Sequence, residues 1–254
     1  MTILGHTIIG NGKKHIIVLH ELMGDSKNYD PIHPYIDTAN FTYYFVDHRG
    51  YGKSKTLTGE YSCQEAAQDV INLITYLALK EVNLVAHSMS TMIAQKIALL
   101  DEHIRQLILI TPLSASGIKM KTPAKEKLLD SVKKNENFVE NVVKSSSKRY
   151  NDTWRTYRIK MGYNASTVEA RYGYMNMYLT TDFIEEVKNI TIPIHIVVGR
   201  NDLPAFNKLT IKKLFENNYN NFDITECMEA GHYPMVEAPV YFATTIENFV
   251  TKLH

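Results

Sequence analysis

One serine of the chain stands where a catalytic nucleophile would be expected. Ser88 lies between a short apolar run, residues 82–85, and an apolar helical pattern that continues to Leu99. A serine on such a tight strand-to-helix turn takes a strained backbone conformation, and the residues two positions away must be small for the helix to pack against the strand. Ala86 and Ser90 are small, although glycine is usual at both positions. The pattern predicts a nucleophile if suitable partners occur elsewhere.

An acid and a histidine follow Ser88 in the order that this chemistry requires. A serine hydroxyl is a weak nucleophile at neutral pH, so it needs an imidazole to accept its proton and a carboxylate to fix the imidazole's tautomer. Asp202 follows the apolar run 192–198, and His232 follows the run 222–227. The sequence therefore predicts a triad in the order serine, acid, histidine, which is the order expected when this turn is catalytic.

Each partner taken alone also has an ordinary structural interpretation. A loop aspartate is usually a turn former or a helix cap, and a loop histidine is usually solvated. Their joint occurrence after two separate strands favours the triad. Glu229 is the nearest rival carboxylate to Asp202, but it lies in a tight loop just before His232 and we expect it to be exposed.

Acyl transfer by this serine also needs two donors for the oxyanion. One is the backbone N–H of the residue after the nucleophile, here Met89, and the other comes from the loop after an earlier strand. That loop follows the run 15–19, and within it we expect the N–H of Leu22 to be the donor, with that of Glu21 as the alternative. His20 is expected to brace the loop by hydrogen bonds.

The elements that must position these groups alternate between strands and helices. Apolar runs rich in β-branched and aromatic residues indicate strands that are buried on both faces. They occur at residues 15–19, 42–46, 82–85, 106–110, 192–198 and 222–227. Apolar residues at helical spacing lie between several of them, at 66–77 and 93–100. This alternation predicts an α/β fold with a parallel, doubly wound sheet, in which ligands bind beyond the carboxyl ends of the strands.

A helical insertion interrupts this alternation. We expect an α/β core at residues 1–111 and 184–254 and a helical cap, or lid, at 112–183, with helical sequence at 125–129, 138–143 and 153–161. The cap holds thirteen Lys and Arg against seven Asp and Glu, a net charge of +6. Solvated outer helix faces explain this charge, and so does attraction of anionic substrates over the site.

The composition excludes several classes of protein. The 254 residues are 44% hydrophobic and 22% charged, with a net charge of +1, so nothing favours disorder or binding to nucleic acid. No apolar stretch approaches the roughly 18–20 residues that cross a bilayer, so we expect no membrane insertion. Two cysteines without metal-ligand spacing, and no signal-like start, favour a cytoplasmic protein without a metal site. The sequence is silent on oligomeric state.

Three segments together resemble the α/β-hydrolase fold superfamily. Residues 20–24 (HELMG) are similar to its His-Gly-x-x-Gly oxyanion loop, and residues 47–54 (DHRGYGKS) to its Asp-x-x-Gly-x-Gly-x-Ser turn. Residues 231–239 resemble its catalytic-histidine segment. The resemblance implies a mostly parallel eight-stranded sheet, a lid inserted after the sixth strand, and no cofactor. The chain departs from the pattern at Glu21 and Ser90, where glycines are usual; the Glu21 carboxylate could face the pocket or the surface.

These expectations define a function. We expect a serine hydrolase that cleaves a small, largely apolar carboxylic ester, thioester or lactone, its small-molecule acyl substrate, through an acyl-enzyme intermediate. Carbon–carbon bond hydrolysis, lyase activity and perhydrolysis use much the same groups, and a non-catalytic ligand-binding protein can keep the fold, so these alternatives remain open. The residues expected to line the substrate pocket are Glu21, His87, Tyr172, Met175, Tyr178 and Tyr233. Packing of the cap on the core would give the tyrosine- and methionine-rich segments the same composition.

Overall fold

The computed structural model describes residues 2–146 and 149–252. Within these ranges, seven strands form one sheet in the order β1-β3-β2-β4-β5-β6-β7. The strands are β1 (His6–Ile9), β2 (Lys14–Leu19), β3 (Phe41–Val46), β4 (Val82–His87), β5 (Ile104–Ile110), β6 (Ile194–Gly199) and β7 (Phe222–Cys227). All neighbouring strands run parallel except β1, which pairs antiparallel with β3.

The six parallel strands coincide with the six predicted apolar runs. Strands β3 and β4 are buried along their whole length, as expected for strands that are covered on both faces. Strand β1 was not predicted because it is short and half exposed, and therefore carries no strong apolar signal. The expected count of eight strands is wrong for the described residues, since each buried run is already used and only β1 is added. The helical insertion follows the fifth strand, β5, and the expected position after a sixth strand is wrong for the same reason.

Helices join the strands and cover both faces of the sheet. The α-helices are α1 (Cys63–Tyr76), α2 (Ser90–Leu100), α3 (Thr122–Lys134), α4 (Phe138–Ser146), α5 (Asp152–Ala165), α6 (Val168–Thr180), α7 (Lys208–Phe215), α8 (Pro234–Glu237) and α9 (Pro239–Thr251). The 3₁₀ helices are η1 (Ser26–Tyr35), η2 (Gly52–Ser54), η3 (Glu186–Asn189) and η4 (Pro204–Phe206). No helix in the described ranges combines the length and the hydropathy that a membrane span requires.

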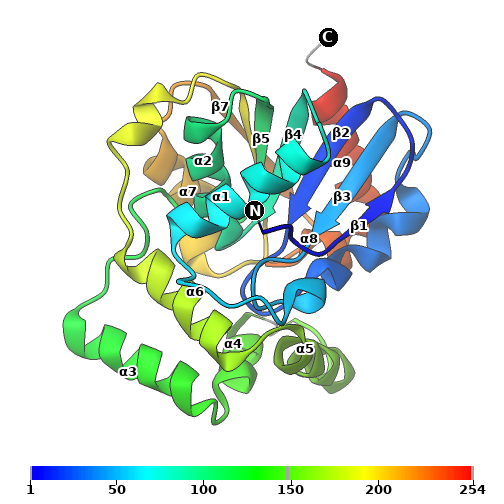
Figure 1. The fold of residues 1–254 in the computed structure, drawn as a ribbon. Coiled ribbons are helices and arrows are strands. Elements are labelled where there is room, and N and C mark those ends of the chain that lie inside the picture. Colours follow the sequence, from blue (N-terminus) through cyan, green and yellow to red (C-terminus); the bar gives the residue numbers. More distant parts are fainter. Residues whose placement is uncertain (1, 147–148, 253–254) are drawn as a thin grey trace.

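The sheet is the middle layer of three (Figure 1). On one face, α1, α2 and α7 pack against it through residues such as Val70, Ile93 and Ile211. On the other face, η1 and α9 pack against it through residues such as Tyr29 and Phe242. Helices α3 to α6, the inserted helices, gather beyond one end of the sheet instead (Figure 1).

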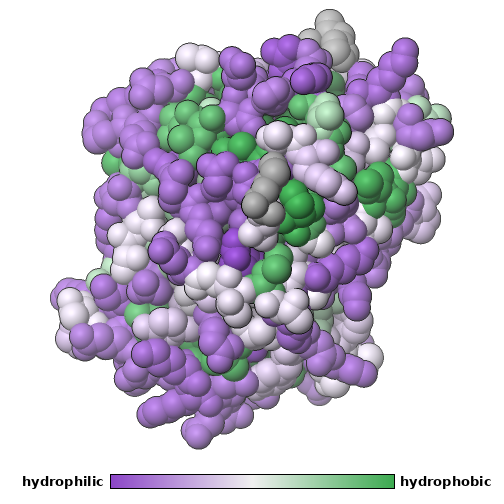
Figure 2. Space-filling model, viewed as in Figure 1, coloured by the Kyte–Doolittle hydropathy of each residue, from purple (hydrophilic) through white to green (hydrophobic). Residues whose placement is uncertain are grey.

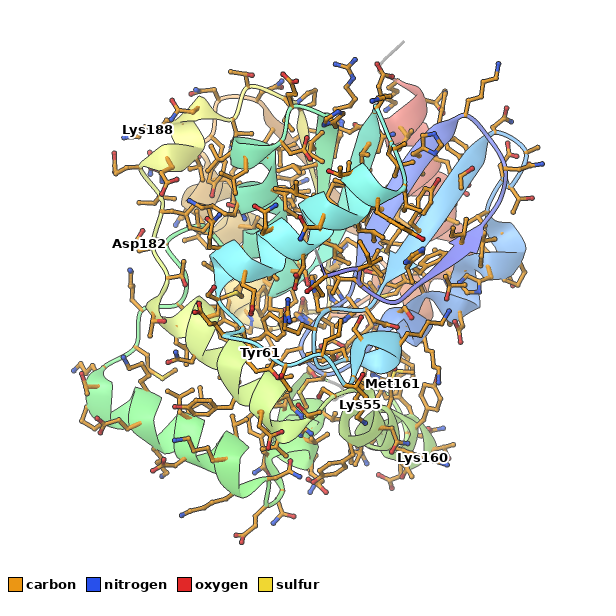
Figure 3. All side chains as sticks on the ribbon, in the orientation of Figure 1. Lys55, Tyr61, Lys160, Met161, Asp182 and Lys188 are labelled. Carbon is orange, nitrogen blue, oxygen red and sulfur yellow. The ribbon has the colours of Figure 1, made fainter. Side chains whose placement is uncertain are left out.

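Several contacts fasten the inserted helices to the core, and Figure 3 labels some of the residues that make them. The Lys55 ammonium donates to the carbonyl of Asn164, with 2.7 Å between Nζ and O. The ring of Tyr61 packs edge-on against Tyr174 of α6. The visible outer face of the inserted helices is mostly hydrophilic (Figure 2), which agrees with the interpretation of their charges as a solvated surface.

The strand order identifies where a ligand would enter. The chain leaves β2 toward β3 and then crosses back to β4, which lies on the other side of β2. In open α/β sheets, the crevice outside the carboxyl ends of two such strands is the usual binding site. The loops that follow β2 and β4 are those expected to hold the oxyanion donors and Ser88.

Candidate active site

Ser88 occupies a strained turn between β4 and α2. Its φ angle of 51° lies in the left-handed region, which is unfavourable for a residue with a side chain and persists only where the surrounding structure enforces it. Its N–H donates to the carbonyl of Ile110 on β5, and its own carbonyl accepts from the N–H of Thr91, with N–O distances of 2.9 and 3.0 Å. The backbone is thus held from the sheet and from the helix. Ala86 and Ser90, the small neighbours, are both fully buried.

The hydroxyl of Ser90 makes contacts that a glycine could not make. It donates to the carbonyl of His20 and accepts from His48 Nε2, 2.8 Å away. The backbone N–H of His48 donates to His20 Nε2, so the ring proton of His20 resides on Nδ1. His20 Nδ1 in turn donates to the carbonyl of Glu21, with 2.7 Å between N and O. These bonds tie the loop after β2 to the nucleophile turn, and they confirm the expected bracing role of His20.

Asp202 and His232 meet at the ends of β6 and β7. His232 Nδ1 lies 2.9 Å from Asp202 Oδ2, and the side chain of Asp202 is fully buried. Burial opposes the charged imidazolium, but the carboxylates of Asp202, Glu21 and Glu237 outweigh it and raise the pKa of His232 above its usual value. With Nδ1 committed to the carboxylate, Nε2 is the ring nitrogen left to exchange a proton. Glu229 is exposed, as expected.

Ser88 and His232 line one cavity of about 210 Å³. Its described lining consists of Glu21, Leu22, Met23, Ser88, Met89, Leu113, Ile118, Val142, Ser145, Ser146, Met175, Tyr178, Leu203, Phe206, His232 and Tyr233. Ser88 makes no hydrogen bond to the imidazole in the described structure. Such bonds are often long before substrate binds and form in the reacting complex.

The loop after β2 lines the same cavity through Glu21, Leu22 and Met23. Neither the N–H of Leu22 nor that of Met89 has a hydrogen-bond acceptor within residues 2–146 and 149–252. The N–H of Met23, by contrast, donates to the carboxylate of Glu21. Two unoccupied N–H groups beside a serine and an imidazole form an arrangement that can stabilise the oxyanion of an acyl-transfer reaction.

Comparisons with known proteins agree with this geometry. Residues 10–237 match the family model described as serine aminopeptidase, S33. The chain belongs to this family and is an α/β-hydrolase. No curated protein sequence matches it.

Solved structures of other α/β-hydrolases show the same fold at low sequence identity. An esterase from Exiguobacterium antarcticum is 20% identical, with a TM-score of 0.84 over 96% of this chain and 94% of that one. The enol-lactonase from Burkholderia xenovorans LB400 is 18% identical, with a TM-score of 0.82 over 98% and 96%. A bromoperoxidase from Bacillus anthracis is 18% identical, with a TM-score of 0.82 over 96% and 94%.

The pocket residues expected from the sequence divide into two groups. Glu21, Met175, Tyr178 and Tyr233 line the cavity of this hydrolase. His87 does not belong to the described lining, because its side chain is fully buried. Its Nε2 donates to the carbonyl of His232 at 2.8 Å, so it holds the backbone of the histidine loop.

Tyr172 also lies outside the described lining, because its ring packs against the ammonium of Lys133, with 4.5 Å between Nζ and the ring centroid. Periodicity along α6 could not separate it from Met175 and Tyr178, since all three occur in one tyrosine- and methionine-rich segment. Only the packing of α6 against its neighbours decides which of them faces the cavity.

One important residue was missed from the sequence altogether. Arg158 of α5 is fully buried, and its Nη2 lies 3.3 Å from Oε1 of Glu21. The alternative in which Glu21 points to the surface is therefore wrong, since only 2% of this residue is exposed. A buried carboxylate requires a partner. A glutamate in this loop therefore implies a cationic partner if it is buried, but the sequence could not identify which arginine supplies the charge.

The hydrolase also has a wider hollow at the opposite end of the strands. It measures about 440 Å³ and is bordered by Lys14, His15, Asn83 and Arg105, among others. It lies at the amino ends of β2, β4 and β5 and contains neither Ser88 nor His232, so the smaller cavity is the candidate active site.

Proposed function

We propose that this α/β-hydrolase is a serine hydrolase that cleaves a small, largely apolar carboxylic ester, thioester or lactone. The observation that carries the proposal is the Asp202–His232 contact of 2.9 Å beside a cavity that Ser88 also lines. Strain at Ser88 and two free backbone N–H groups support it. In this proposal, the inserted helices act as a cap over the cavity.

The reaction would proceed in two acyl-transfer steps. Ser88 Oγ attacks the carbonyl carbon while His232 Nε2 accepts the hydroxyl proton, and Asp202 stabilises the resulting imidazolium. The N–H groups of Leu22 and Met89 hold the oxyanion. The leaving alcohol, thiol or enol takes the proton from His232, and a water molecule, with His232 as base, then releases the acid and restores Ser88.

The cavity lining supports an uncharged, compact acyl group. Most of its side chains are apolar or aromatic, and no lysine or arginine belongs to the described lining. The volume of about 210 Å³ is below the range of about 300–1,000 Å³ typical of drug-sized ligands. Among the residues that the structure describes, the positive charges of the inserted helices thus lie outside the cavity lining. The esterase and enol-lactonase of the same fold are named for this class of reaction.

An ester bond is favoured over the peptide bond that the family description suggests. An aminopeptidase must recognise a free amino group, usually through a carboxylate, and Glu21 is the one carboxylate in the described lining. Its oxygens are already bonded to Met23, Asn28 and Arg158. We also propose a cytoplasmic location, since Cys63 and Cys227 are both buried free thiols.

A panel of activated esters, thioesters and lactones of graded acyl length and charge tests the proposed substrate class. We expect short, uncharged acyl groups to give the highest kcat/KM, and acyl groups that carry a carboxylate to be at least about tenfold poorer, because that carboxylate would lose its hydration against a mostly apolar lining. Equal or better turnover of the anionic acyl groups would contradict the assignment. A dipeptide amide panel that outperforms the esters would replace it with a peptidase.

A further inference from the structure

The loop after β2 is held by an ion pair that lies far from the solvent. Glu21 stands where the His-Gly-x-x-Gly pattern, which this loop resembles, has its first glycine, and it pairs with Arg158 of the inserted helix α5, 137 residues away. The exposed fractions of the two side chains are 3% and 0%. Removing two charges from water is costly, and a buried ion pair is often no more stabilising than apolar side chains of similar size. The significance of this pair therefore lies in its position.

The contacts of this loop fix the two peptides that flank Leu22 and leave one of their two N–H groups free. The peptide between Glu21 and Leu22 is held at its carbonyl by His20 Nδ1, at 2.7 Å. The next peptide is held at both ends: the carbonyl of Leu22 accepts from the Tyr51 hydroxyl at 2.9 Å, and the N–H of Met23 donates to the Glu21 carboxylate. The two peptides that flank the Cα of Leu22 are thereby fixed, and of their two N–H groups that of Leu22 has no acceptor within the described residues.

Arg158 fixes the Glu21 carboxylate, which in turn holds the N–H of Met23. Its Nη1 donates to Oδ1 of Asn28, and Nδ2 of Asn28 donates to Oε1 of Glu21 at 2.9 Å, so the three side chains close a ring. The guanidinium also lies 3.9 Å above the ring of Tyr233, the residue after His232. One arginine thus contacts both the oxyanion side and the histidine side of the cavity.

We propose that Glu21 and Arg158 are positioning residues, which aim the Leu22 N–H at the oxyanion and couple this aim to the docking of helix α5. The inference rests on the proposed function, because it assumes an oxyanion at this place. Arg158 acts through Glu21, and Glu21 acts through the peptide that follows Leu22. A donor held before reaction stabilises developing charge without reorganisation, so its loss of aim affects the transition state more than the bound substrate.

The test measures kcat and KM of Glu21→Gly, Glu21→Gln, Arg158→Met and the Glu21→Gly/Arg158→Met double variant on the best ester of the panel. In Glu21→Gly we expect kcat to fall between about tenfold and a hundredfold, because the donor is misplaced rather than removed, and KM to change less than about threefold. Glu21→Gln retains an oxygen for the Met23 N–H, so its kcat should lie between those of wild type and Glu21→Gly.

The double variant keeps the test decisive if a single variant does not fold. It removes both buried charges together, and its kcat should match that of Glu21→Gly, because Arg158 acts through Glu21. Affinity for a trifluoromethyl ketone, which forms a tetrahedral adduct with serine, should fall in proportion to kcat/KM. Lys119→Met breaks the exposed pair with Asp182 at the base of the insertion and should leave kcat unchanged. Asp182 is labelled in Figure 3.

The outcomes separate this inference from the proposed function. Folded variants with wild-type kcat and unchanged ketone affinity would show that the pair only fastens α5 to the core, and would overturn the inference. Additive losses in the double variant would also overturn it. If the Ser88→Ala variant keeps the ester turnover of the wild-type protein, the proposed function itself is rejected.

Discussion

Two buried carboxylates face the candidate active site, and they differ in the kind of partner that each one has. Asp202 pairs with an imidazole, whose charge changes near neutral pH, whereas Glu21 pairs with a guanidinium, whose charge does not change. A carboxylate beside a titrating group can stabilise a charge that forms during reaction. A carboxylate beside a permanent cation keeps its charge balanced throughout the reaction, so its main role is to hold geometry. The comparison separates proton transfer from positioning within one cavity.

The largest effect is expected from removal of the Ser88 hydroxyl, which the proposed roles of the Asp202–His232 and Glu21–Arg158 pairs both serve. Ser88→Ala should lower ester turnover by more than about a thousandfold, since catalysis without the nucleophile falls to what binding and the oxyanion donors supply. The measurement is initial-rate hydrolysis, with a thermal melt to show that the variant folds. Serine and alanine both carry a Cβ, so the strained φ of 51° at this position costs them about the same. The stability of Ser88→Ala should therefore stay close to that of wild type. Near-wild-type turnover would place the chemistry elsewhere.

Replacing the carboxylate behind His232 should cost more than replacing the one behind Leu22. Asp202→Asn should reduce kcat by about 10³–10⁴, because the amide favours the wrong imidazole tautomer. This loss exceeds the tenfold to hundredfold loss expected of Glu21→Gly. Glu229→Gln is the matched control, since that carboxylate is close in sequence to His232 but exposed, and its kcat should not change. Equal losses in the Asp202 and Glu21 variants would erase the distinction between the two carboxylates.

The pH profile tests how the charge of Glu21 acts on His232. His232 must be neutral to accept a proton, and its pKa is raised by Asp202, Glu21 and Glu237 against the effect of burial. The acid limb of kcat/KM should therefore have its midpoint above 6.5, the ordinary value for histidine. Glu21→Gln removes one of the negative charges and should move the midpoint to lower pH. An unchanged midpoint in that variant would contradict the electrostatic part of the account.

The smallest effect concerns the bonds that tie the two sides of the site together. Ser90→Ala removes the hydroxyl that donates to His20 and accepts from His48, so both lose a partner in a buried region. We expect about 1–3 kcal/mol of lost stability in urea unfolding. Thr244→Ala, on an exposed face of α9, is the control and should change stability by less than about 0.5 kcal/mol. A neutral Ser90→Ala would mean that the small size of this residue matters and its hydroxyl does not.

Much of this architecture could be predicted because its signals are local. The six parallel strands follow apolar runs, although β7 at the sheet edge is only half-buried. Ser88, Asp202 and His232 each follow one of these strands, so strand order alone brings their loops to one end of the sheet. Strand β1 escaped prediction because it is short and half exposed. The implied eighth strand failed for a related reason, since no further buried run exists to form it in the described chain.

The contacts that depend on helix packing could not be predicted. Arg158 is one of thirteen basic residues in the insertion, and its contact with Glu21 spans 137 residues. The helix that carries it shows no clear apolar face, so its buried side could not be identified from periodicity. His87 illustrates the converse: it was expected to line the pocket, but alternation along β4 turns its side chain toward the His232 loop.

Covalent labelling tests the central claim most directly. A fluorophosphonate reacts with a serine that is activated by an imidazole, and mass spectrometry of the digested protein identifies the modified residue. The account predicts one adduct on Ser88, absent from Ser88→Ala and formed at least about a hundredfold more slowly in His232→Ala. An adduct on another residue, or labelling of Ser88 at an equal rate without the imidazole, would contradict it.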